Sequence, residues 1–239
     1  MREKPKRKRF YKTVSVTFSE ADNAYLVLLD DRQIRTPARS QQLIPNEALA
    51  NALADEWQAQ ADEINPELMP LTRLVNTALD GIAGSENMVR ADIVQYAGSD
   101  LLCYRAEEPQ ALIDQQSVAW DPVLEWVRVT FGAQLKQTPS LRHVPQNPTA
   151  LDAIAMALDQ EDAFSLAALH VLTTLTGSAI LALAARKGFQ KPQDIWEMAH
   201  VDENWQISRW GNDDEASDRR KKRFLEFSAA IRLLALIAK

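Results

Sequence analysis

Residues able to do chemistry gather most densely between His200 and Gly211, near the C-terminus. This segment combines two adjacent acids with two tryptophans, a glutamine and a glycine: Asp202, Glu203, Trp205, Gln206, Trp210 and Gly211. Adjacent carboxylates point in different directions on a helix, which is poor geometry for shared acid–base catalysis. Acids beside aromatic side chains are typical of surfaces that recognise another protein. The segment therefore predicts binding rather than a reaction.

Other catalytic and cofactor-binding patterns are missing from the sequence. It has neither the glycine-rich P-loop nor the dinucleotide fingerprint, and no serine lies in a G-x-S-x-G motif. His143, His170 and His200 are about thirty residues apart and have no second ligand at metal-binding spacing. His170 lies in an apolar run and is predicted to be a core histidine, and Cys103 lies between large apolar residues, where a thiol is inert. We therefore predict no catalytic residue, no metal and no cofactor.

Charge is distributed unevenly along the 239 residues, whose net charge is -6. The first twelve carry seven basic side chains against one acid, a local charge of +6, so the remainder carries -12. An acidic body repels nucleic acid, so we expect no nucleic-acid partner. Residues 1–10 are predicted to form a basic, flexible tail. No apolar region follows it as in a secretory signal, and the single cysteine fits a reducing compartment.

One apolar run, over residues 164–185, is long enough to cross a bilayer. It contains five serine and threonine residues, and the sequence has no second run of this kind. A helix that is apolar all round is also what the centre of a helical domain requires. We therefore predict a buried helix and no membrane insertion.

The spacing of the apolar residues changes near residue 45. Residues 11–37 alternate or form short apolar runs between turns, which predicts three antiparallel strands, the third over Gln33–Thr36. From Asn46, a predicted N-cap, the spacing becomes helical. Helices are predicted at about 46–61, 70–82, 86–97, 109–131, 149–160, 163–186, 191–200 and 213–237. The last one carries a basic run, Arg219–Arg223, that is predicted to be solvated helix surface.

These elements predict an α+β fold with two domains. A small antiparallel β-rich domain would cover residues 11–45, and a larger all-helical domain would cover 46–239. A meander of three short strands is too small to fold alone, so it must pack on the helices that follow.

Several polar and aromatic motifs are spread along the chain. They are centred on Glu56, Trp57, Arg73, Asp80, Asp100, Arg105, Trp120, Asp121, Trp210 and Gly211. For most of them we expect structural roles. Asp80, Asp100 and Arg105 would pair with one another or cap helices, and Trp57, Trp120 and Trp126 would lie in the core.

Together and in this order, the motifs resemble the ATP12 family, the assembly chaperones of the F1 part of ATP synthase. The resemblance extends from Arg35-Thr36-Pro37 to Gln206 and Trp210-Gly211. It implies a β-rich domain followed by a larger helical one, and an activity without catalysis: binding the free F1 α subunit and preventing its aggregation before it meets β. It also implies an important acidic position just before the Gln-x-x-x-Trp-Gly signature, which Asp202 matches best.

The resemblance assigns further expectations to this chain. Asp202, Glu203, Trp205 and Gln206 would contact the α subunit, while Trp210 and Gly211 would end one helix before the next. The family occurs in mitochondria and in some bacteria, so the chain is expected in a bacterial cytoplasm, or in the mitochondrial matrix if it is eukaryotic. We expect a monomer. One departure is Asp31, where the family commonly has glycine, so the turn there is expected to differ in type.

One alternative stays open. The polar residues of 69–80 and 100–105 could instead form a small-molecule site in the cleft between the β-rich and helical domains. The chain would then be an enzyme, and carboxylates of raised pKa would be expected in that cleft.

Overall fold

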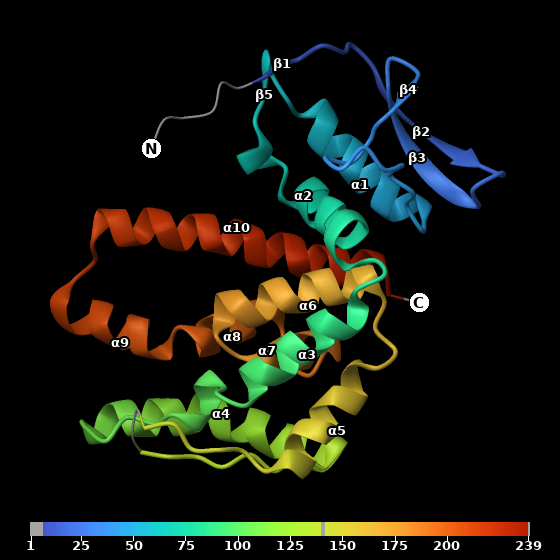
Figure 1. Cartoon of the computed structure of the whole chain (residues 1–239). Helices are drawn as coiled ribbons and strands as arrows, with labels where there is room; N and C mark the ends of the chain where they lie inside the picture. The colour runs from blue at the N-terminus through green and yellow to red at the C-terminus, as the bar shows by residue number, and fades with distance from the viewer. Residues whose placement is uncertain (1–6, 140–141, 239) are drawn as a thin grey trace.

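The computed structural model describes residues 7–139 and 142–238. Within them the fold is α+β, as predicted, with a small antiparallel sheet near the N-terminus and ten α-helices. Figure 1 shows the sheet and α1 at one end of the molecule and α4 and α5 at the other, with α6, α7 and the long α10 between them.

The described strands are β1 (Arg7–Lys8), β2 (Val14–Ser19), β3 (Ala24–Leu29), β4 (Arg32–Gln33) and β5 (Glu63–Ile64). Strands β2, β3 and β4 form an antiparallel meander, with Leu29 opposite Arg32 across a two-residue turn. Both turn residues, Asp30 and Asp31, have positive φ, 46° and 64°, as the favoured two-residue hairpin turns require. The Asp30 carboxylate also accepts backbone N–H bonds from Lys12 and Thr13, both at 2.9 Å, which stabilises the turn without a glycine.

The prediction of a flexible tail over residues 1–10 is wrong for residues 7–9. Residues 1–6 lie outside the described part of the chain, but Arg7 and Lys8 form β1, which pairs with β5. The Arg9 N–H continues this pairing with the carbonyl oxygen of Asp62 at 2.8 Å. The partner strand is more than fifty residues away in sequence, and both strands are too short to show a period.

The helices are α1 (Glu47–Gln58), α2 (Pro70–Thr77), α3 (Glu86–Ala97), α4 (Gln110–Phe131), α5 (Pro148–Leu158), α6 (Ala163–Thr176), α7 (Ala179–Arg186), α8 (Pro192–Ala199), α9 (Val201–Trp210) and α10 (Asp214–Leu236). One expectation needs correction. The single helix predicted over 163–186 is two helices, because Gly177 takes a left-handed φ of 69° and Ser178 caps α7 through the Leu181 N–H at 2.9 Å. Residues 201–210 form α9, which ends at Trp210 and Gly211 as expected.

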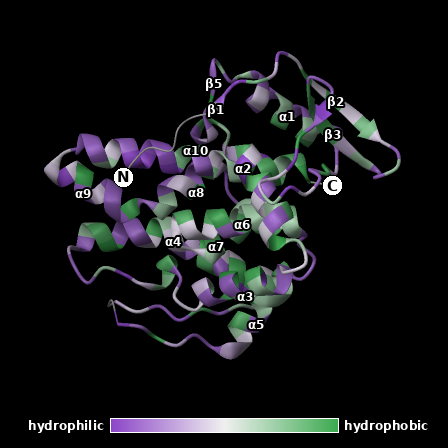
Figure 2. Cartoon of the chain, turned by 45° about the horizontal axis from the view of Figure 1, so that its top comes forward, coloured by the Kyte–Doolittle hydropathy of each residue, from purple (hydrophilic) through white to green (hydrophobic). Residues whose placement is uncertain are grey.

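The core centres on α6 and α7, most of whose residues are buried. Figure 2 shows these two helices largely in the hydrophobic colours, in the middle of the molecule. Among the described helices, none is long and apolar enough to cross a membrane. His170 was predicted to be a core histidine, but it lies outside this core. It is partly exposed on α6, and its Nε2 lies 2.7 Å from Asp92 Oδ2.

The sheet is joined to the helices by α1, which packs against β2 and β3. Trp57, on α1, is partly buried against the core, and its carbonyl oxygen accepts the Tyr11 hydroxyl at 2.6 Å. We propose that the β-rich domain includes α1 as well as residues 11–45, because α1 covers the sheet.

Glu56 links α1 to the first turn of α2. Its carboxylate accepts the N–H of Leu71 at 2.9 Å and both the N–H and the hydroxyl of Thr72 at 2.7 Å. Replacing Glu56 by alanine leaves these donors without their acceptor, which should lower the free energy of unfolding by about 2 kcal/mol. Urea denaturation measures this. The exposed neighbour Asp55, changed to alanine, is the control, and equal midpoints for the two variants would contradict the capping role.

Candidate functional site

The predicted binding segment forms α9 and the turn into α10. The acids Asp202 and Glu203 lie in its first turn, where the helix dipole favours negative charge. Gly211 ends the helix with a φ of 86°, and its N–H donates to the Ile207 carbonyl at 2.9 Å. The role of Gly211 in ending one helix before the next therefore follows from its backbone, as expected.

Contacts from α8 fix α9 at its start. His200, between the two helices, is 3% exposed, and its Nδ1 donates to the Trp196 carbonyl oxygen at 2.7 Å. Burial lowers the pKa of His200 below its ordinary value. Asn204 continues the attachment, with its amide Nδ2 2.8 Å from Glu197 Oε2. These bonds set which side of α9 faces the body of the protein.

A groove of about 690 Å³ lies along one side of α9, opposite residues 101–116, and we call it the Asp202 groove. Asp202, Trp205, Gln206 and Trp210 line it from α9, at the spacing of one helix face. Glu107 and Glu108 line the opposite wall. Among the described residues that line it, the one cation is Arg105, which is paired with Asp121 at 2.7 Å, so this lining has an excess of negative charge.

Asp202 is held in a defined position in this groove. Its Oδ1 accepts from Gln116 Nε2 at 2.7 Å, and Gln116 Oε1 accepts the Ala106 N–H at 2.8 Å. Gln116 is only 2% exposed, whereas Asp202 remains partly exposed. A fixed, accessible carboxylate is suited to pairing with a basic group on a partner.

The two tryptophans of α9 differ in their exposure to solvent. Trp205 is 9% exposed, packed under the Arg209 guanidinium at 4.5 Å, so it forms the floor of the groove rather than free contact area. Trp210, expected to be a structural pivot, is 79% exposed at the end of α9. The apolar area available to a partner is therefore that of Trp210, because tertiary packing buries the Trp205 ring.

The remaining two predicted contact residues divide between faces. Gln206 is exposed and lines the Asp202 groove. Glu203 is not among the groove residues, and its carboxylate lies 3.8 Å from His200 Nε2. Adjacent helix positions diverge by about 100°, so only one acid of the pair can face the groove.

The motif residues fall into two groups. Arg105, Trp120 and Asp121 meet behind the groove, where the Arg105 guanidinium pairs with Asp121 and lies 5.1 Å from the Trp120 ring centre. The fully buried Trp120 donates its Nε1 hydrogen to the Met198 carbonyl at 2.8 Å, fixing α4 against α8. This group supports the wall opposite α9.

The second group connects elements far from the groove. Asp80 accepts the Thr36 hydroxyl at 2.6 Å and the Ala38 N–H at 2.9 Å, and Arg73 pairs with Glu226 on α10. Asp80, Asp100 and Arg105 thus do not pair with one another, but Asp100 caps a helix, as the alternative expectation had it, since its side chain accepts the Leu102 N–H. Each holds a different pair of segments.

Asp100 has the raised pKa that a catalytic carboxylate would show, but not the access. It is 0% exposed, and burial raises its pKa to about 6 against the bonds that favour its ionised form. Cys103 beside it is 1% exposed, and burial raises its thiol pKa to about 12, which fits the inert role predicted for it. The two polar segments proposed for an enzyme site line different hollows, 70–77 one of about 120 Å³ and 101–105 the Asp202 groove.

Sequence reasoning missed the far wall of the groove. Glu107 and Glu108 precede Pro109 at the start of α4. In the sequence, two acids at this place indicate only an ordinary charged loop. Only the fold shows that they face Asp202 across a groove. The residues of the described ranges form no cluster of three or more side chains suited to holding a metal ion.

Comparison with known proteins places this arrangement in a family. The family model described as ATP12 chaperone protein matches residues 8–128. The Atu1473 protein of Agrobacterium tumefaciens, a candidate chaperone, is 43% identical with a TM-score of 0.94, over 99% of this chain and 88% of that one. Atp12 from Paracoccus denitrificans is 38% identical with a TM-score of 0.90, over 97% and 99% of the two chains. A D202K mutant of P. denitrificans Atp12p, in the residue numbering of that protein, is 37% identical over 96% and 97%, with a TM-score of 0.89. The chain belongs to the ATP12 chaperone family.

Proposed function

We propose that this chain binds the free α subunit of the F1-ATPase and prevents its aggregation until it assembles with β. The observation that carries the proposal is the Asp202 groove, which presents a fixed carboxylate beside an exposed tryptophan. A subunit of an obligate ring exposes a large apolar interface when it is alone, and such surfaces aggregate. Covering that surface reversibly requires binding area and charge but no chemical step.

In this proposal Asp202 pairs with a basic group on α, with Gln206 beside it, and Trp210 supplies the apolar contact. Glu203 contributes only at the edge of the contact, because it lies outside the groove. We propose that the chain acts as a monomer and binds α without a cofactor. We place it in a bacterial cytoplasm, since the relatives above come from bacteria.

Light scattering of isolated α subunit, diluted from denaturant without ATP, tests the proposal. An equimolar amount of this protein should suppress the rise in scattering, and later addition of β should yield assembled αβ complexes. Scattering equal to that with serum albumin would contradict a chaperone role toward α.

Replacing Trp210 by alanine should weaken the binding of α about tenfold without changing thermal stability. An exposed ring contributes little to the fold, but large aromatic side chains dominate the binding energy of interfaces. Isothermal titration calorimetry with α measures the affinity. Met88, 76% exposed on α3, is the control site for the same change to alanine. Equal affinities for the two variants would exclude Trp210 from the interface.

A further inference from the structure

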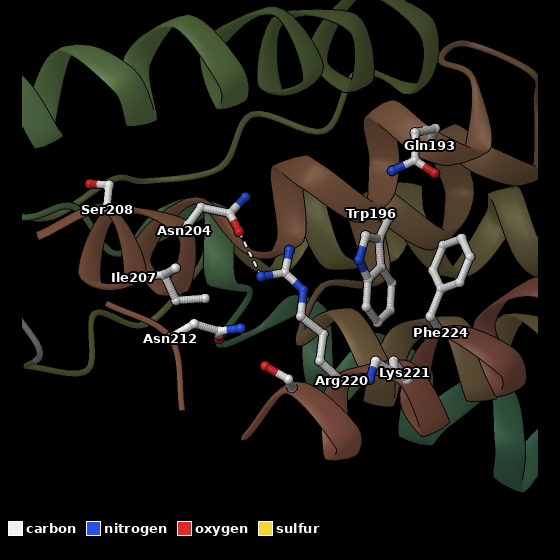
Figure 3. Close-up of a pocket in the computed structure, with 10 residues that line it drawn as sticks. Gln193, Trp196, Asn204, Ile207, Ser208, Asn212, Arg220, Lys221 and Phe224 are labelled. Carbon is white, nitrogen blue, oxygen red and sulfur yellow. Dashed lines mark hydrogen bonds between the residues drawn. The ribbon is translucent and has the colours of Figure 1, made fainter. Parts of the chain in front are cut away.

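A second groove lies on the opposite side of α9 from the Asp202 groove. It has a volume of about 640 Å³ and is enclosed by α8, α9 and the first half of α10. Figure 3 shows Trp196, Arg220 and Phe224 converging on it from α8 and α10, with Asn204 and Ile207 on the α9 side. We call it the Arg220 groove.

The floor of the Arg220 groove is aromatic. Trp196 lies with its ring centre 5.1 Å from that of Phe224, edge to face. Phe224 is 36% exposed, and Ile207 faces the same space from α9. A soluble surface that leaves an aromatic residue open beside other apolar side chains has area available for a partner.

The rim of the groove is basic. Arg220 and Lys221 both line it, and none of the described residues lining it is acidic, while Lys221 Nζ pairs with the exposed carboxylate of Asp218 at 3.0 Å. Arg220 is held in place by Asn204 Oδ1, which accepts from its guanidinium at 2.7 Å, while Glu197 Oε2 is more distant at 3.8 Å. The groove therefore places an oriented guanidinium beside an apolar floor, in a chain whose net charge is -6. The planar guanidinium of an arginine is suited to binding carboxylates through two parallel N–H donors.

Helix α9 is the shared wall of two grooves of opposite charge. Asp202, Trp205 and Gln206 face the acidic one, while Asn204, Ile207 and Ser208 face the basic one. A partner bound along the exposed end of α9 would cover both. Such a partner must present a basic group on one side and carboxylates with apolar side chains on the other.

Resting on the proposed function, we propose that the Arg220 groove is a second contact site for the F1 α subunit, and that it binds an acidic, apolar segment of that client. The apolar side chains of the segment lie on Trp196 and Phe224, as in the binding of amphipathic segments to grooves. Its carboxylates pair with Arg220 and Lys221.

The test compares two double variants of the full chain by calorimetric titration with isolated α. The first, R220Q/K221Q, removes two charges from the groove. The matched control, R219Q/K222Q, removes two charges from the same helix outside the groove. We expect about tenfold weaker binding for the groove variant, a reduced salt dependence, and a change of less than threefold for the control. Thermal melting confirms that both are folded.

Equal affinities of the two folded variants would overturn the second site. If D202K weakens binding while R220Q/K221Q does not, the proposed function stands and this inference falls. If the unaltered chain does not bind α at all, both fall.

A photo-crosslinking phenylalanine analogue at Ser217, which lines the groove, identifies the occupant. A crosslink to a segment of α that contains both acids and apolar residues supports the proposal. A crosslink only to a second copy of this chain, or only to a segment of α without acids, overturns it.

Discussion

Replacing Asp202 by lysine is expected to weaken binding of the F1 α subunit by on the order of a hundredfold, because a like charge facing a basic group costs several kcal/mol. The Asp202 carboxylate is fixed by Gln116 and accessible in its groove. Reversing the charge at this position therefore acts directly on the contact with α. Surface plasmon resonance with immobilised α measures the loss.

Three further variants separate charge from structure. D202N keeps an oxygen that can accept from Gln116 Nε2 but removes the charge, so it should lose an intermediate amount of affinity. E203K lies outside the groove and should lose less than D202K. D152K makes the same charge change at an exposed site on α5 and should bind as the unaltered chain does. A folded D202K protein with undiminished affinity for α would remove Asp202 from the interface.

Replacing Asp100 by alanine is expected to lower the free energy of unfolding by roughly 3 kcal/mol, because buried donors lose their acceptor. Asp100 Oδ1 accepts the Leu102 N–H and Oδ2 accepts the Ile180 N–H, each at 3.1 Å. It therefore ties the turn at 101–103 to the first turn of α7. Chemical denaturation measures the change. D100N should cost less, since the amide oxygen retains one of these bonds.

Asp100 also predicts a pH dependence of stability. Burial raises its pKa from an ordinary 3.8 to about 6, so the folded chain binds the proton more tightly than the unfolded chain does. This contribution to stability is complete below about pH 4 and is lost as the pH rises through 6. The stability difference between the unaltered chain and D100N should therefore fall between pH 4 and 7. A difference that stays constant over this range would contradict the raised pKa.

Much of the helical framework could be predicted from local sequence. The span predicted for α3 agrees with the structure, and the charged first turn of α10 was visible in Asp213 and its neighbours. The β1–β5 pairing could not be predicted, because it depends on backbone bonds between two-residue strands distant in sequence. The break at Gly177 lay inside an apolar run whose composition suited one helix as well as two.

The sequence shows which helix carries the candidate contact residues, but it does not show how that helix is oriented. The segment after His200 was identified, and helical spacing relates Asp202 to Gln206. Which side of α9 faces outward depends on packing against α8, and this decides that Trp205 is buried while Trp210 is exposed. Neither groove can be seen in the sequence, since each is completed by a different distant segment.

The most direct test of the account is a titration of this protein against isolated F1 α and, separately, isolated F1 β, without nucleotide. We expect saturable one-to-one binding to α, at least tenfold weaker binding to β, and release of α when β is added to the complex. Absence of binding to α, or equal binding to both subunits, would contradict it.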